Sequence, residues 1–291
     1  MMQAINTLSA TLYVLDWLHT TCYPRILHVF DQASNLINER GEVLSVVTLQ
    51  VGNGPFNLVV GDNILFSGQL TVESPITISA DQLHLGGLII DTAHARLWDP
   101  RPDWEKLYIK RDEIHYQLMS LREPQFATKQ SPDQFGECSG QTSAALPKTI
   151  PIIHELISSL VIADAPASSV SAKQLAGLGV GLTPSGDDLM LGAVYATWII
   201  HPYDTAKALA EEIANIAAPL TTSLSAAWLR SAGRGEAGIL WHQFFDALIT
   251  AEHTQIQEAT DNILAVGETS GADALMGFMK TFENWGRVKA D

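Results

Sequence analysis

The feature that most constrains this chain is a segment, residues 189–200, that is apolar on every face of a helix. Such a helix belongs in a protein interior, because none of its faces suits water. It follows directly on residues 177–188, a run that has four glycines within ten residues and ends in Ser-Gly-Asp-Asp. The sequence therefore predicts a buried central helix whose first turn carries hydroxyl and carboxylate side chains.

The glycine-rich run is typical of a site where a ligand approaches the backbone. Glycines allow close approach, and the free N–H groups at the start of a helix attract anions. The run is not a Walker A motif, because no lysine follows its last glycine, and it does not fit the dinucleotide-binding fingerprint. The alternative interpretation is that these residues only cap the helix and favour its dipole. The predicted anion- or substrate-binding residues of the run are Gly179, Gly181, Thr183, Ser185 and Gly186, and the predicted catalytic residues are Asp187 and Asp188.

A second stretch of the chain repeats the same pattern. Residues 185–192 and 270–277 both read Ser-Gly-x-Asp-x-x-x-Gly. In each copy the serine suits a helix cap, and the glycine lies four residues after the aspartate on the same face, where a second helix could pack closely. Two such helices could direct their positive ends at one anion, although ordinary capping explains the second copy equally well. We therefore add Ser270 and Gly271 to the binding residues and Asp273 to the catalytic ones.

Other candidates lie outside the two copies. Arg234 could clamp an anion with its planar guanidinium group. Asn53 lies in a Gly-Asn-Gly-Pro turn that either closes a hairpin or reaches across to the site. Glu236 is either a general base or metal ligand, or an ordinary solvent-facing acid at a helix start. The histidines show no metal-ligand spacing, so the metal prediction is limited to Mg²⁺ at Asp188.

The charge balance excludes some classes of partner. The chain has 32 acidic and 17 basic residues and a formal net charge of −15. Such a surface repels phosphate backbones and anionic membranes, so we predict no nucleic-acid and no membrane partner, and a small anionic metabolite as ligand. Two cysteines do not suggest a disulfide framework, and the first residues do not resemble a signal peptide. These features predict a cytoplasmic protein.

The pattern along the chain predicts an α+β protein. Residues 1–125 are expected to form a mainly β domain, a small sandwich or barrel; residues 126–149 a linker or lid; and residues 150–291 an all-α domain around the buried central helix. The expected strands span residues 25–30, 42–49, 56–60, 64–66 and 76–79, after a leading helix at 7–19. The expected helices of the second domain span residues 152–162, 186–200, 204–217, 221–231, 238–250, 254–266 and 271–282.

The two Ser-Gly copies also carry a resemblance to a known family. Residues 179–188 and 267–273, supported by residues 52–57, 221–225 and 235–236, resemble the AllH-like family, which has been described as uncharacterised or as carboxylases. Gly-Leu-Thr-Pro-Ser-Gly-Asp-Asp is the specific part of the match. After Gly267 the family pattern leads us to expect a histidine or a small residue, where this chain has Glu268.

The resemblance implies a function in carbamoyl transfer. One branch of the family is associated with oxamate carbamoyltransferase in allantoin (purine) degradation, in which oxalurate and phosphate exchange with oxamate and carbamoyl phosphate. On this basis the chain would be one subunit of a multi-subunit transferase. Two alternatives stay open: an ATP- and Mg²⁺-dependent ligase or kinase-like enzyme that uses the same loop, and a noncatalytic subunit that binds a metabolite.

Overall fold

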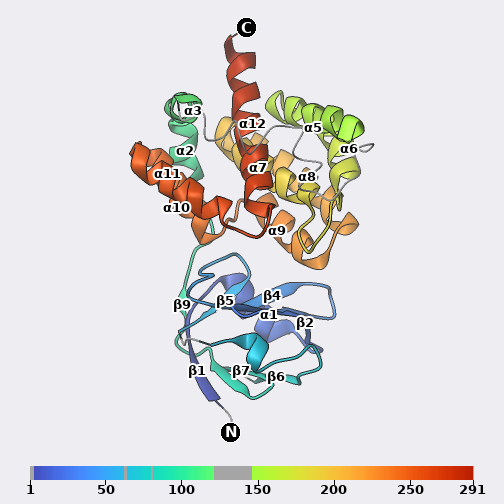
Figure 1. Ribbon diagram of the computed structural model, residues 1–291, viewed down its shortest axis with the longest axis vertical. Coiled ribbons are helices and arrows are strands. Elements are labelled where there is room, and N and C mark those ends of the chain that lie inside the picture. The colour runs from blue at the N-terminus through green and yellow to red at the C-terminus, as the bar shows by residue number, and fades with distance from the viewer. Residues whose placement is uncertain (1–2, 62–63, 80, 121–145, 291) are drawn as a thin grey trace. The chain divides into compact units, whose positions relative to one another are not determined.

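The computed structural model describes residues 3–61, 64–79, 81–120 and 146–290. The chain divides into two compact units, a β-rich one comprising Met1–Pro100 with Ala237–Ile239, and a helical one comprising Arg101–Glu236 with Leu240–Asp291 (Figure 1). A β-rich unit followed by a helical unit confirms the predicted fold class. The division falls at residue 100, not at the boundary of 125 that the sequence suggested.

The β-rich unit is a nearly closed, barrel-like sheet. Its strands follow the order β2-β3-β4-β5-β1-β8-β7-β6, and β9 pairs with β1. The long first strand is central because its first half pairs in parallel with β8 and its second half runs antiparallel to β5. The strands are β1 (Gln3–Ala10), β2 (Arg25–Val29), β3 (Ala33–Ile37), β4 (Val43–Thr48), β5 (Asn57–Val60), β6 (Ile76–Ser79), β7 (Gln82–Leu85), β8 (Leu88–Asp91) and β9 (Arg96–Leu97).

The start of the chain differs from the sequence prediction. The helix expected at residues 7–19 is wrong in its first part, because β1 continues to Ala10 and the helix α1 spans Leu12–Thr20. Thr11 separates the two elements: its side chain accepts a hydrogen bond from the Val14 N–H and caps α1. Residues 64–66 are also not a strand, since a short 3-10 helix, η1 (Phe66–Gly68), begins there.

The helical unit is built around α7 (Ser185–Ile200), as predicted. Every residue of α7 is buried. The helix α12 (Ser270–Ala290) runs beside it (Figure 1). The other helices are α2 (Trp104–Ile109), α3 (Arg111–Ser120), α5 (Leu146–Val161), α6 (Ala165–Leu175), α8 (Tyr203–Ala217), α9 (Ser223–Gly233), α10 (Ile239–Thr250), α11 (His253–Leu264) and the 3-10 helix η2 (Ala218–Leu220).

Two differences concern this helical unit. The helix α6 was not expected, because its sequence is dominated by Ser and Ala and shows little apolar periodicity; its N-cap is Asp164, which accepts from the Ala167 N–H. The helix α2 belongs to this unit because Trp104 stacks on Trp198, with ring centroids 5.7 Å apart, and donates to the Gly235 carbonyl.

The predicted linker or lid at residues 126–149 lies outside the described residues as far as residue 145, and its last four residues belong to α5. Within the described part of the chain, no helix combines the length and the apolar character needed to cross a bilayer.

Candidate functional site at the crossing of α7 and α12

The two helices α7 and α12 cross at a distance that only glycine permits. A Cβ on Gly192 would lie 1.7 Å from the carbonyl oxygen of Ala274, and a Cβ on Gly277 would lie 2.0 Å from that of Leu189. Ala274 and Leu189 occupy matching positions, one residue after the aspartate of each copy. The contacts of the two repeats are therefore reciprocal, which confirms the predicted close packing.

The helices that precede α7 and α12 extend this internal similarity. Gly186 lies against the carbonyl of Leu175 at the end of α6, and Gly271 lies against that of Ile263 in α11. The N–H of Gly186 donates to the carbonyl of Leu178, and the N–H of Gly271 donates in the same way to the carbonyl of Val266 in the loop before α12. Two N–H groups that an anion could have used are thus already engaged by carbonyl oxygens.

The starts of the two helices meet through hydroxyl groups. The Oγ1 of Thr183 and the Oγ of Ser270 are 2.8 Å apart. Hydrogen bonds then cross between the copies, because Ser270 bonds to Asp188 of the first copy and Ser185 bonds to Asp273 of the second. The structure therefore brings these two serines, these two aspartates and Thr183 into one cluster.

Asp188 is the most perturbed carboxyl group of the cluster. Its residue surface is 6% exposed, and its Oδ2 has no hydrogen-bond partner among the described residues. Burial raises its pKa to about 8, and the nearby charge of Asp273 contributes to the rise, while hydrogen bonds from Ser270 and Thr183 act against it. Asp188 is therefore mostly protonated at neutral pH.

Asp273 has a similar environment and a smaller shift. It is 4% exposed, and its Oδ2 also lacks a partner in the described part of the chain. Burial raises its pKa to about 6, against hydrogen bonds from Ser185 and Thr269. Near pH 7 the two carboxyl groups thus hold about one proton between them, so that one is an acid and the other a carboxylate.

The neighbouring Asp187 has a different environment. Its Oδ1 accepts from the N–H of Gly177 at 2.9 Å, and its Oδ2 accepts from the hydroxyl groups of Thr221 and, at 2.8 Å, Ser225. Burial raises its pKa, and these three bonds act against the rise. Asp187 ties the glycine loop and the start of α9 to α7, and a catalytic role for it stays a prediction.

The glycine loop folds back over the start of α7. Gly179 has φ +124°, and a Cβ on it would lie 2.7 Å from the backbone nitrogen of Ser185. Gly181 has φ +92° and open space around it, so backbone conformation, not crowding, favours glycine there. These two glycines shape the loop, and their part in ligand binding stays a prediction.

The predicted cation, Arg234, is not brought to the cluster. It follows the last turn of α9, where its guanidinium pairs with Glu236 at 2.6 Å. Thr222, at the other end of α9, donates to the carbonyl of Leu182 in the glycine loop. The 11 residues of α9 correspond to roughly 16 Å at about 1.5 Å per residue, which separates Arg234 from that loop.

Asn53 lies in the β-rich unit. Its Oδ1 accepts from the Ser9 hydroxyl at 2.5 Å, and its carbonyl accepts from the N–H of Ile239. These bonds fix the turn within that unit, and contact of Asn53 with a ligand stays a prediction.

Three hydroxyl residues that hold the aspartates were not predicted as site residues: Thr221, Ser225 and Thr269. Thr269 had a signal in the sequence, since it directly precedes the second Ser-Gly pair. For Thr221 and Ser225 the only signal was a hydroxyl-rich run, whose partner Asp187 is more than 30 residues away. As for metals, the described residues contain no group of three or more His, Cys, Asp or Glu side chains suited to bind an ion.

Two family models match the chain. A model described as oxamate carbamoyltransferase subunit AllH matches residues 175–282, which contain both Ser-Gly copies. A model described as the AllH family N-terminal domain matches residues 6–97, within the β-rich unit. No solved structure gives a significant match.

Proposed function

Because the chain belongs to the AllH family, we propose that it is a subunit of a carbamoyltransferase that exchanges oxalurate and phosphate with oxamate and carbamoyl phosphate. The description of the family model supports the enzyme class. The observation that supports a site on this chain is the pair of buried carboxyl groups, Asp188 and Asp273, each with an oxygen that has no partner among the described residues.

The pair suits the amide end of these metabolites better than their anionic end. Carbamoyl phosphate, oxamate and oxalurate all carry an NH₂ group, whose two N–H donors need acceptors once water is excluded. The Oδ2 atom of Asp273, the mostly ionised member of the pair, is such an acceptor, and leaving it unsatisfied costs about 1–3 kcal/mol. A phosphate or carboxylate, in contrast, would be repelled by the ionised member of the pair.

Carbamoyl transfer also requires the movement of one proton. When phosphate attacks the carbamoyl carbon of oxalurate, a C–O bond forms, the C–N bond breaks, and the departing amide nitrogen must gain the proton that the phosphate loses. A carboxyl group with a pKa of about 8, such as Asp188, is protonated at neutral pH and can give its own proton to the nitrogen, after which it regains the proton that the phosphate loses. Asp273, which is mostly ionised, can orient the substrate.

The anionic ends of the substrates need other donors. The hydroxyl groups of Thr183 and Ser270 are already engaged by each other and by Asp188, so cationic side chains of partner subunits are the candidates. Mg²⁺ at Asp188 would require the ionised carboxylate, so a cation held there would be an alternative to the acid role of this residue and no part of the proposed step.

The test is oxalurate phosphorolysis by the chain combined with its partner subunits. We expect Asp188→Asn to lower kcat at least about 100-fold, in the range expected for loss of a general acid. Asp204→Asn, the same change at an exposed position in the first turn of α8, should leave kcat unchanged. Full activity in both Asp188→Asn and Asp273→Asn would refute the proposed site.

Binding to the isolated chain distinguishes a catalytic subunit from a noncatalytic one. Chemical-shift changes at α7 and α12 on addition of oxamate are expected in either case. If oxamate binds but the Asp188→Asn complex keeps its full kcat with a higher KM, the chain holds a substrate without transferring the group. The proposal would be contradicted if ATP with Mg²⁺ raised the melting temperature of the chain while oxamate and carbamoyl phosphate left it unchanged.

A further inference from the structure

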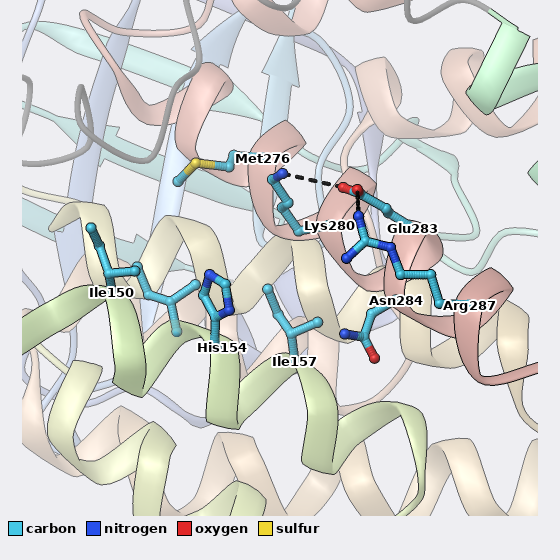
Figure 2. A pocket seen from close by; sticks show the side chains of 9 residues that line it. Ile150, His154, Ile157, Met276, Lys280, Glu283, Asn284 and Arg287 are labelled. Carbon is cyan, nitrogen blue, oxygen red and sulfur yellow. Dashed lines mark hydrogen bonds and ion pairs between the residues drawn. The ribbon is translucent and has the colours of Figure 1, made fainter. Parts of the chain in front are cut away.

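A separate cleft lies between α5 and α12 in the helical unit (Figure 2). It has a volume of about 260 Å³, which corresponds to roughly nine water molecules at about 30 Å³ each. Its apolar lining comes from three isoleucines of α5 and from Met276 of α12. The polar lining consists of His154, Lys280, Glu283, Asn284 and Arg287.

The polar side chains of the cleft form a network with excess positive charge. Glu283 is largely buried, with its side chain 9% exposed, and both of its oxygens are engaged: Oε2 by Lys280 at 3.2 Å and Oε1 by Arg287 at 2.5 Å. One carboxylate therefore faces two cations. With the histidine counted as neutral, the cleft has a formal charge of +1 in a chain whose net charge is −15.

This network leaves hydrogen-bond donors for a ligand. A lysine ammonium group has three N–H donors and a guanidinium has five, so one bond from each to Glu283 leaves most of their capacity. The apolar wall opposite is formed by Ile150, Ile153 and Ile157, which recur at spacings of three and four residues along α5. Figure 2 shows Ile150, His154 and Ile157 directed toward the side chains of α12.

We propose that this cleft binds a small monocarboxylate with an apolar body of on the order of six to ten non-hydrogen atoms. The carboxylate would lie against Lys280 and Arg287, whose positive charge Glu283 only half compensates. The body would lie against the α5 isoleucines. A cationic ligand of the same shape would be repelled by Lys280 and Arg287, and a neutral one would lack the negative charge that pairs with them.

The cleft is distinct from the aspartate pair but lies on the same helix. Met276 follows Asp273 by three residues and Lys280 follows it by seven, so the charged end of the cleft is roughly 10 Å from Asp273 at about 1.5 Å per residue. A ligand in the cleft therefore contacts the helix that carries Asp273 without contacting that residue. The proposal does not depend on the carbamoyl-transfer function.

The test measures the binding of three probes of equal length to the full chain: hexanoate, hexanamide and hexylamine. Calorimetry gives the affinities, and chemical-shift mapping locates the bound probe. We expect hexanoate to bind at least tenfold more tightly than the other two, with shift changes at α5 and α12. Lys280→Gln and Arg287→Gln should each weaken hexanoate binding at least fivefold, and Ile150→Trp should abolish it by filling the cleft.

Two control variants make the result specific. Lys207→Gln removes a lysine charge on α8, where Lys207 lies near Glu211, and should leave hexanoate binding unchanged. Asp188→Asn should also leave it unchanged, so that failure of this proposal and failure of the proposed function give different results. The proposal is overturned if no probe binds, if the three probes bind equally, or if Arg287→Gln and Ile150→Trp, both folded by circular dichroism, bind hexanoate as the parent does.

Discussion

Replacement of Asp188 by Asn should make the helical unit more stable at neutral pH. The pKa of Asp188 is about 8 in the folded chain against an ordinary value of 3.8. A group whose pKa is raised by folding contributes most to stability below its ordinary pKa, and that contribution is lost as the pH rises toward the folded value. Asparagine resembles the protonated carboxyl group in shape but does not titrate, so the variant avoids this loss.

The size of the effect follows from the shift. A pH of 7 lies about three units above the ordinary pKa of aspartate, and each unit corresponds to about 1.36 kcal/mol. Ionisation of Asp188 in the unfolded chain therefore lowers the free energy of unfolding by up to about 4 kcal/mol. Asp188→Asn should therefore raise the free energy of unfolding at pH 7 by up to about this amount. The gain should nearly vanish at pH 4.

The assay is urea unfolding at pH 4, 5, 6, 7 and 8, followed by tryptophan fluorescence, since five of the seven tryptophans lie in the helical unit. The exposed Asp204→Asn is the matched control and should parallel the parent at every pH. If the difference between Asp188→Asn and the parent does not grow from pH 4 to pH 8, Asp188 does not have a raised pKa and the reasoning about the pair is wrong.

Three further predictions concern Asp273, the helix crossing and Asp187. Asp273→Asn removes the charge that helps to raise the pKa of Asp188, so that pKa, measured by carboxyl-carbon NMR, should fall; an unchanged value would mean that the two groups do not interact. Gly192→Ala should lower the free energy of unfolding by about 3 kcal/mol or more, because its Cβ would collide with a carbonyl of α12. The control Gly68→Ala, with nothing within 4 Å of its added Cβ, should cost little. Equal urea midpoints for the two variants would contradict the close crossing. Thr221→Val removes a donor from the buried Asp187 and should lower the free energy of unfolding by about 1–3 kcal/mol. The control Thr254→Val, at an exposed position of α11, should be nearly neutral. If Thr221→Val is also neutral, Asp187 does not need this bond.

Local patterns were enough to predict some parts of the fold. The apolar run at 189–200 predicted the central helix correctly, because a helix without a polar face can only be buried. The repeated Ser-Gly-x-Asp-x-x-x-Gly pattern predicted the close crossing, because glycine four residues after the aspartate removes the side chain from one helix face. The strands β1, β3, β7 and β8 were not predicted. The first half of β1 pairs with β8, more than 80 residues away. The strands β3 and β7 are short and partly polar, and they are defined by pairing with their neighbours β4 and β8.

Local sequence could not assign roles to the neighbouring Asp187 and Asp188. They differ by one position in the chain, but Asp187 meets three donors from the glycine loop and from residues 221–225. Asp188 instead faces the second repeat, more than 80 residues away. Which aspartate is satisfied and which keeps an unpartnered oxygen depends on the partners that folding brings to each.

By itself, the amino-acid sequence determined the fold class, the buried helix and the two matching helix starts, because these follow from hydrophobic pattern and from the steric freedom of glycine. Only the tertiary structure decided that Ser185 and Ser270 bond across to the aspartates of the opposite copies, that Arg234 pairs with Glu236, and that a charged cleft lies beside α12. The physical reason is that burial and charge pairing are properties of residues brought together from distant parts of the chain.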